Sequence, residues 1–165
     1  MFGQLSIDTA KFAREATELS GAFSPAQMRR VATQLFDLNG DIRYVVRGYV
    51  TGRGGPAIAI RITGSVNLRC ERCLERLQYD LLLERDLVLL NGIDEFGPRD
   101  DEDDLVDIIP AAPHLDLHAT LEEEVMLGLP MAPRHVEGEC RVPGEVTSDG
   151  ERQPSAFAVL AKLKQ

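Results

Sequence analysis

Basic residues and cysteines are both scarce in this sequence of 165 residues. Its 18 Lys and Arg residues against 27 Asp and Glu residues give a formal net charge of −9. That charge argues against a protein that coats nucleic acid with its whole surface, so any RNA contact must use a local patch. Three cysteines are too few, and odd in number, for a disulfide framework, which leaves metal binding and free thiols as their roles.

Long apolar stretches are missing as well. No window reaches the roughly 18 consecutive apolar residues of a membrane span, and the opening MFGQLSIDTAKF lacks the basic start and apolar run of a signal peptide. We therefore expect a cytoplasmic protein with no membrane partner. With 44% hydrophobic and 27% charged residues, the sequence predicts one domain over residues 1–165, with mobile loops at about 91–104 and 137–155.

Two helices are predicted in the N-terminal part of the chain. The stronger one covers about 25–36, where Ser24 is a favourable N-cap, Pro25 suits the first helical position and apolar residues repeat at helical spacing. An earlier helix is predicted over 8–19, beginning after Asp8, although its apolar face is weaker. The stripe of the stronger helix is expected to face the core.

After Asp41 the spacing of the apolar residues changes to two, which is typical of half-buried strands. The strands predicted in this way cover about 41–51, 57–70, 76–90 and, as a short fourth strand, 105–109. A turn sequence, GRGGP, links the first two strands. The strands are therefore expected to follow one another as an antiparallel meander.

Two further helices are predicted after the strands. The segment DLHATLEEEVMLGL begins with Asp116 as its N-cap, and its glutamates at 122–124 are expected to form a solvated face rather than a docking face. The ending AFAVLAKLKQ predicts a short last helix. The fold class is therefore α+β: an antiparallel meander sheet packed with helices from about 25–36, 116–129 and the C-terminus.

The stretch LRCERCLERL places Cys70 and Cys73 at the tip between two predicted strands. A tight turn that carries two thiolates is half of a tetrahedral zinc site, the zinc knuckle. One later segment offers two further ligands, His135 and Cys140, at a spacing that suits zinc. Together the four residues would hold one structural Zn and pin the irregular 130–142 segment to the sheet.

Two other roles for the cysteines stay open. Cys70 has the parity of a core position, so the thiols can simply be buried, and the sequence favours that role over zinc. Redox chemistry is least favoured, because a thioredoxin-type motif belongs to a βαβ unit and none is predicted here. Without a nucleophile and base set, and with the carboxylates at 101–104 in a predicted loop, we expect no enzyme.

Four stretches resemble, in order over nearly the whole chain, the YceD family of large ribosomal RNA subunit accumulation proteins. They are SPAQMRRVA, CERCL, DLHATLEEEVMLGLPMAPRH followed by a cysteine, and SAFAVLAKLK. The resemblance implies a role in making, processing or stabilising 23S rRNA, contacted directly or indirectly, without a known catalytic activity. The matching positions are Cys70, Arg72, Cys73, Asp116, Leu117, Glu122, Glu124, Leu129, Pro130, Pro133, His135 and Cys140.

Several arginines near the knuckle agree with the rRNA role that the resemblance implies, because they could contact RNA. The candidate RNA surface consists of Arg61, Arg69, Arg72 and Arg76. Such side chains can hold phosphates or stack on unpaired bases, although beside Glu71 and Glu75 they can also form weak surface pairs alone. An acidic protein is also suited to bind a basic large-subunit ribosomal protein, and an assembly chaperone of that kind is the second hypothesis.

Overall fold

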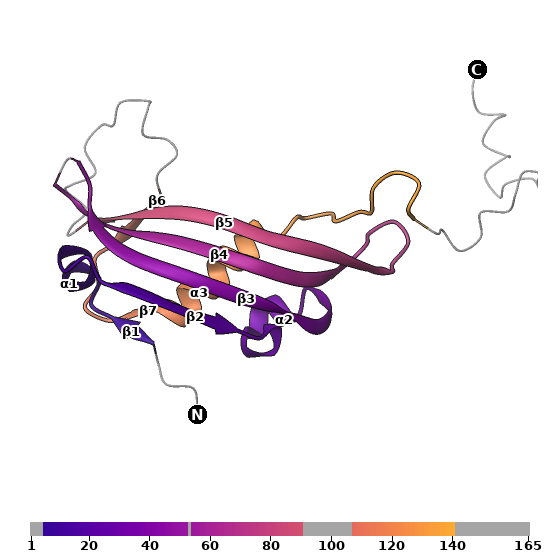
Figure 1. Cartoon of the computed structure of the whole chain (residues 1–165), viewed down its shortest axis with the longest axis horizontal. Helices are drawn as coiled ribbons and strands as arrows, with labels where there is room; N and C mark the ends of the chain where they lie inside the picture. The colour runs from indigo at the N-terminus through magenta and orange to yellow at the C-terminus, as the bar shows by residue number, and fades with distance from the viewer. Residues whose placement is uncertain (1–4, 53, 91–106, 141–165) are drawn as a thin grey trace, which may run out of the picture.

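A long, open sheet with helices on one face dominates the computed structural model (Figure 1), which describes residues 5–52, 54–90 and 107–140. The elements in chain order are β1 (Ser6–Ile7), α1 (Thr9–Arg14), β2 (Glu18–Phe23), the 3₁₀ turn η1 (Pro25–Gln27), α2 (Arg29–Ala32), β3 (Leu35–Val50), β4 (Pro56–Arg69), β5 (Arg76–Leu90), β6 (Asp107–Pro110), β7 (Leu115–Asp116) and α3 (Leu117–Gly128). The predicted loop at 91–104, most of that at 137–155 and the C-terminal helix lie outside the described residues.

The sheet has the strand order β2-β3-β4-β5-β6, and β1 pairs separately with β7. Neighbouring strands are antiparallel from β2 to β5. The predicted α+β class and the meander of three long strands are therefore confirmed. The short fourth strand also exists, as β6, but it pairs parallel to β5 and so does not continue the meander.

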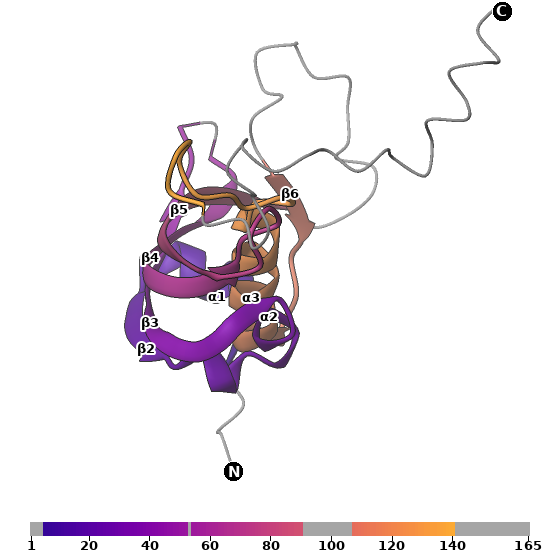
Figure 2. The same cartoon turned by 90° about the vertical axis from the view of Figure 1, so that its right-hand side faces the viewer.

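One face of the sheet forms the core with the helices. Viewed along the strands, α3 lies on one side of the sheet (Figure 2). Its buried side chains are Leu117, Leu121 and Val125, and the buried strand residues include Ile42, Val46, Ile58, Ile60, Ile62, Val66, Leu68, Leu81 and Leu87. In β3 the buried residues alternate with exposed ones, as the period of two predicts. In β4 some neighbouring positions, such as Asn67, are buried as well. Within the described part of the chain, no helix is long and apolar enough to cross a membrane.

The N-terminal helices are shorter than predicted. The helix predicted over 8–19 ends at Arg14, and β2 follows it, because Phe23 stacks on Tyr44 of β3 at 5.1 Å between ring centroids and Gly21 lies under the same ring. A Cβ at Gly21 would lie 2.6 Å from the Tyr44 hydroxyl oxygen, so this close approach depends on glycine. Pairing with β3 thus overrides the helical spacing of the segment.

The helix predicted over 25–36 consists of η1 and α2 alone, since β3 already begins at Leu35. Its predicted apolar stripe nevertheless reaches the core: Met28 and Val31 are fully buried, and Leu35 packs against the core as the first residue of β3. The apolar positions were identified correctly, but they are shared between a helical turn and a strand.

Two of the three glutamates at 122–124 are buried, which contradicts the predicted solvated face. Glu122 is 8% exposed and Glu124 is 7% exposed, whereas Glu123 is exposed. An Oε1 atom of Glu122 accepts a hydrogen bond from the backbone N–H of Arg30 at 2.6 Å, in the first turn of α2. The carboxylate thus satisfies a backbone donor at the start of α2, where negative charge is favourable.

Replacing Glu124 with glutamine is expected to stabilise the protein at neutral pH. Burial raises the pKa of Glu124, although the Arg85 guanidinium lowers it through an ion pair in which Nε of Arg85 lies 3.5 Å from Oε2 of Glu124. That ion pair is too long for a hydrogen bond, so Oε2 has no hydrogen-bond partner among the described residues. A carboxyl group whose pKa is raised by folding favours the folded state at low pH and weakens it as pH rises above the ordinary glutamate value. The variant has no carboxyl group to ionise at this position, so its free energy of unfolding at neutral pH should be higher by roughly 1 kcal/mol.

Urea unfolding from about pH 4 to neutral pH checks this prediction, because the gap between Glu124→Gln and the natural protein should widen as pH rises. Glu123→Gln is the control, since that side chain is exposed on the same helix and is the smallest of the causes that act on the pKa of Glu124. Its unfolding free energy should stay within about 0.5 kcal/mol of the natural value. A gap that narrows with rising pH would contradict the prediction.

Candidate metal centre and the arginines around it

The connection between β4 and β5 is a tight turn that carries two of the predicted ligands. The backbone N–H of Leu74 donates to the Cys70 carbonyl at 2.8 Å, and the N–H of Cys70 donates to the Glu75 carbonyl at 3.0 Å. Leu74 takes a left-handed backbone conformation with φ of 63°. Cys70 and Cys73 are both buried at this tip, so the predicted knuckle geometry is present.

The segment after α3 runs beside this turn and brings the other two ligands. The N–H of Glu71 donates to the Pro133 carbonyl at 2.9 Å, which ties the segment to the turn. The Nε2 atom of His135 lies 3.1 Å from the carbonyl oxygen of Arg76. Donation from Nε2 to this carbonyl leaves the Nδ1 lone pair facing the thiols, an arrangement typical of histidines that bind metals.

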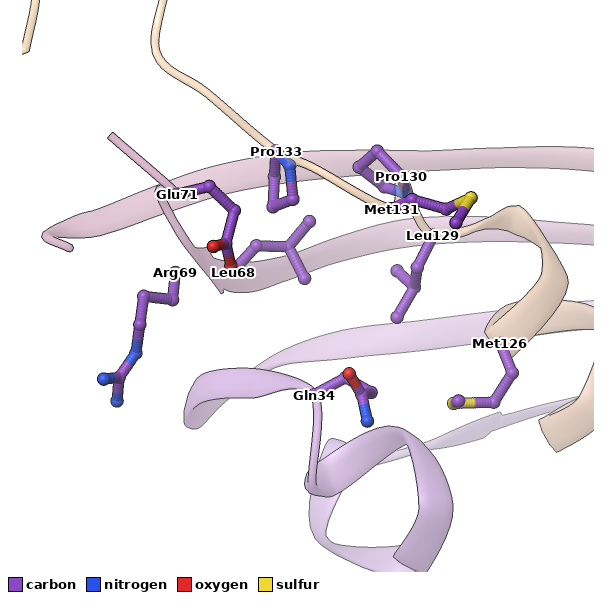
Figure 3. Close-up of a pocket in the computed structure, with 9 residues that line it drawn as sticks. All are labelled: Gln34, Leu68, Arg69, Glu71, Met126, Leu129, Pro130, Met131 and Pro133. Carbon is purple, nitrogen blue, oxygen red and sulfur yellow. The ribbon is translucent and has the colours of Figure 1, made fainter. Parts of the chain in front are cut away.

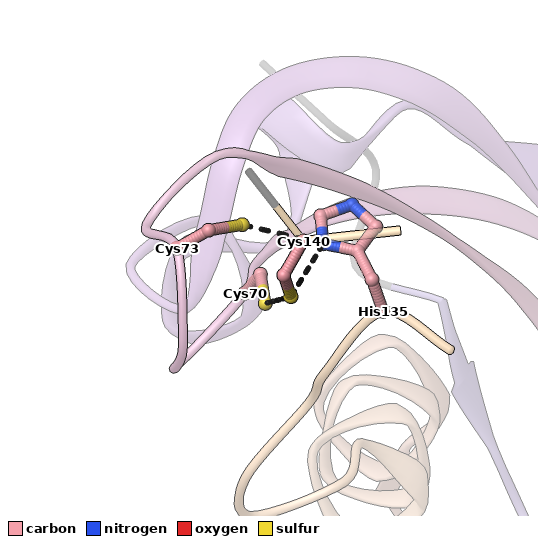
Figure 4. A group of neighbouring side chains, drawn as sticks. All are labelled: Cys70, Cys73, His135 and Cys140. Atoms are coloured by element: carbon pink, nitrogen blue, oxygen red, sulfur yellow. Dashed lines mark hydrogen bonds between the residues drawn. The ribbon is translucent and has the colours of Figure 1, made fainter. Parts of the chain in front are cut away.

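Four ligand atoms converge at this point (Figure 4). The Sγ atoms of Cys70 and Cys140 are 3.6 Å apart, and Nδ1 of His135 lies 3.4 Å from Sγ of Cys73 and 3.7 Å from Sγ of Cys140. All four atoms lie within 4.8 Å of one another. Bond lengths of about 2.3 Å to sulfur and 2.0 Å to nitrogen place tetrahedral ligand atoms about 3.5–3.8 Å apart, so the cluster could bind a metal ion.

The electrostatics of the cluster favour a thiolate at one position. Burial tends to raise the pKa of Cys70, but backbone hydrogen bonds from Cys73, His135 and Arg72 lower it to about 5. Burial and the neighbouring sulfurs raise the pKa of Cys140 to about 11. One thiolate thus forms readily, while the further negative charge that a second would add is unfavourable without a cation.

The structure gathers three of the four candidate RNA-binding arginines near the knuckle. Arg69 and Arg76 lie directly opposite each other on β4 and β5, and Arg72 is exposed in the turn between them. Arg61 lies eight residues before Arg69 along β4, about 26 Å away at the usual rise of a strand. It forms an ion pair with Glu84 on the solvent face of the sheet, so it does not belong to this group.

The sequence reasoning missed one exposed arginine of this region, Arg134, which precedes the ligand His135 and is thereby brought to the knuckle. Its position next to a predicted ligand was the signal that could have identified it.

A pocket of about 230 Å³ lies beside the knuckle, between the end of α3 and the connection from α2 to β3 (Figure 3). Polar and apolar groups contribute about equally to its lining, which consists of Gln34, Leu68, Arg69, Glu71, Met126, Leu129, Pro130, Met131 and Pro133. These residues come from three segments that are far apart in sequence. The pocket has no local sequence signal for that reason.

Comparison with known proteins finds one matching family and a similar protein over nearly the whole chain. Residues 58–164 match the family described as Large ribosomal RNA subunit accumulation protein YceD. A protein of that name from Haemophilus influenzae is 27% identical over 169 residues, which cover 98% of this chain and 95% of the relative. No solved structure matches the chain. The matched region includes the knuckle, α3 and both later ligands.

Proposed function

The chain belongs to the YceD family of large ribosomal RNA subunit accumulation proteins, and from this membership we propose that it supports the accumulation of 23S rRNA as a non-enzymatic factor. The observation that carries the non-enzymatic part is the ligand set. Three cysteines and one histidine would fill all four positions of a tetrahedral ion bound there, whereas catalytic zinc sites keep one position open for water or substrate. A closed site of this kind has a structural role.

The ion that suits this set is zinc, because soft thiolate ligands with one imidazole in tetrahedral geometry favour it. Bound there, it would join the β4–β5 turn to the segment after α3, which otherwise is tied to the turn by the Glu71 and His135 backbone contacts. Its role is then to hold both segments in one rigid tip. That tip is the part of the protein that carries the clustered arginines.

Direct contact with RNA is proposed for this tip, through Arg69, Arg72 and Arg76. All three side chains are exposed, and arginine is suited to phosphate contacts because its guanidinium offers several donors in one plane. A local group of this kind is compatible with the net charge of −9, because only a few phosphates need to be neutralised.

Crosslinking in cells with ultraviolet light, followed by sequencing of the recovered RNA, tests the proposal. The natural protein should yield discrete sites in large-subunit rRNA, and Arg72→Glu should lose them because it reverses charge at the tip. Arg14→Glu makes the same charge change on α1, at the other end of the sheet, and should keep the sites (Figure 1). Recovery of RNA no greater than background would argue against direct contact.

A basic ribosomal protein is the second candidate partner, and the acidic balance of 27 carboxylates against 18 basic residues favours it. On α3 the exposed carboxylate available for such a contact is Glu123, because Glu122 and Glu124 are buried. If this partner is the true one, Glu123→Lys should weaken capture of the ribosomal protein while Arg72→Glu leaves it unchanged.

A further inference from the structure

We propose that the solvent face of the sheet next to the knuckle binds unpaired RNA, with a phosphate held between Arg69 and Arg76 and a base stacked on Phe36. This inference rests on the proposed function, since it assumes direct contact with RNA. It adds the class of RNA, single-stranded rather than duplex, and an aromatic residue that the sequence did not single out. We call Phe36, Arg69 and Arg76 the stacking row.

Two arginines of the stacking row are direct cross-strand neighbours, and in the part of the chain that the structure describes neither has a carboxylate in an ion pair. Arg69 is the direct cross-strand neighbour of Arg76, and like charges at such positions destabilise a sheet. Neither arginine takes part in an ion pair within the described residues. An anion placed between the two guanidinium groups would relieve their repulsion, and a phosphate matches their donors.

One carboxylate lies near enough to be influenced by Arg76. The pKa of Asp37 is lowered, mainly by a hydrogen bond from the Asn67 side chain, then by Asn39, with a smaller contribution from Arg76. Asp37 Oδ1 accepts from Nδ2 of Asn67 at 2.8 Å and from the N–H of Asn39 at 2.9 Å. The hydrogen bonds of the Asp37 carboxylate therefore come from Asn67 and Asn39 and not from the two arginines, which remain available to a ligand.

The third member of the stacking row supplies an aromatic surface. Phe36 is 37% exposed although it is large and apolar, and the Arg69 guanidinium lies over its ring, 5.8 Å from the centroid. Unpaired bases stack on aromatic rings and on guanidinium planes, which together form a platform of this kind. In a duplex the base faces are covered by stacking, so the platform suits single strands.

An irregular stretch of β3 holds Phe36 in position. The register with β4 shifts between Leu35 and Gly40, so the residues between them form a bulge. Asn67 is 8% exposed and reaches this bulge from β4 through its bonds to Asp37 and to the Asn39 carbonyl. Bulges commonly redirect side chains at binding sites. Because Asn67 holds the bulge in place, Phe36 is presented to solvent without a need for rearrangement on binding.

Fluorescence anisotropy with a labelled single strand of about 12 nucleotides and a duplex of the same sequence tests the inference. The single strand should bind about tenfold more tightly than the duplex. Phe36→Ala should weaken single-strand binding about tenfold, which matches the loss of one stacked base. Phe36→Tyr should restore it, because the ring is retained.

The double variant Arg69→Ala, Arg76→Ala tests whether these two arginines hold a phosphate. It should weaken binding of the single strand and lower the slope of log affinity against log salt by about 0.7 for each phosphate contact removed. Matched controls lie on the same face of β3: Val45→Ala, which is 38% exposed, and Arg43→Ala, which is paired with Asp41. Both controls should bind as the natural protein does, and all variants should keep their zinc content and melting temperature.

The outcomes separate this inference from the function on which it rests. Equal binding of duplex and single strand, or natural affinity in Phe36→Ala, would overturn the stacking row while direct RNA contact stands. Absence of binding to either RNA by the zinc-loaded natural protein would overturn direct contact as well. In that case the ribosomal-protein partner is the remaining candidate.

Discussion

Protein purified without chelator is expected to carry one equivalent of zinc, and Cys140→Ser is expected to lose it. The reason is geometric: Sγ of Cys140 lies within 3.7 Å of both Cys70 Sγ and His135 Nδ1, so its loss opens the ligand set. Structural sites bind zinc with about 10–16 kcal/mol. If about 3 kcal/mol of this stabilises the fold, the melting temperature should fall by about 6–12 °C. Elemental analysis and calorimetry measure the two effects.

The control for this prediction is a neighbour in the same segment. Val136 is 73% exposed and supplies no ligand, so Val136→Ala should keep both the zinc and the melting temperature. A strong chelator should lower the melting temperature of the natural protein to that of Cys140→Ser and leave the variant unchanged. A natural protein without zinc, as stable as Cys140→Ser, would mean that the cluster is a group of buried thiols.

The long strands were predictable because burial on one face imposes a period of two over many residues. From Ile58 to Leu68 and from Leu77 to Leu89 the apolar residues alternate, with few interruptions, and both runs are strands. The shorter β2 gives no comparable signal. Its exposed Gly21 lies against the ring of Tyr44 in another strand, and the glycine leaves room for that ring. A contact between distant segments therefore decides the structure of residues 18–23.

The buried glutamates of α3 also could not be predicted from local sequence, because their environment depends on a distant segment. Glu122 was expected in water because charged residues rarely lie in a core without a partner. Its partner is the backbone N–H of Arg30, 92 residues away in sequence. The sequence of α3 itself contains no signal for this contact. The sequence identified the helix and its Asp116 N-cap correctly, but the partner of Glu122 could be found only from the packing of α3 against α2.

The cluster of candidate metal ligands was easier to predict from the sequence than the positions of the candidate RNA-binding arginines. Cysteine and histidine are few in this chain, so the possible combinations are few, and the four residues chosen do converge. Arginines are more numerous, and their parity on a strand fixes the face but not the distance along it. Arg61 shares a face with Arg69 and yet lies far from the knuckle. Phe36 was missed because a bulge, which has no sequence signature here, turns it outward.

Replacing Gly48 with alanine is expected to destabilise the fold strongly, because α1 packs with its backbone directly on β3 there. A Cβ at Gly48 would lie 2.2 Å from the Phe12 carbonyl oxygen and 2.7 Å from the Ala13 Cα atom. The N–H of Gly48 also donates to the Thr17 carbonyl at 2.8 Å. Backbone atoms cannot rotate aside as a side chain would, so α1 must move and its buried residues must leave their sites.

The expected loss for Gly48→Ala is about 3 kcal/mol, at the upper end of ordinary overpacking, and corresponds to a fall of about 6–12 °C in melting temperature. Urea unfolding measures it. Gly52→Ala is the matched control, because no atom of the described residues lies within 4 Å of the added Cβ. That variant should be as stable as the natural protein or slightly more so, since alanine restricts the unfolded chain. If both variants unfold at the same urea concentration, α1 does not rest on β3 at Gly48, and the packing of α1 described above is wrong.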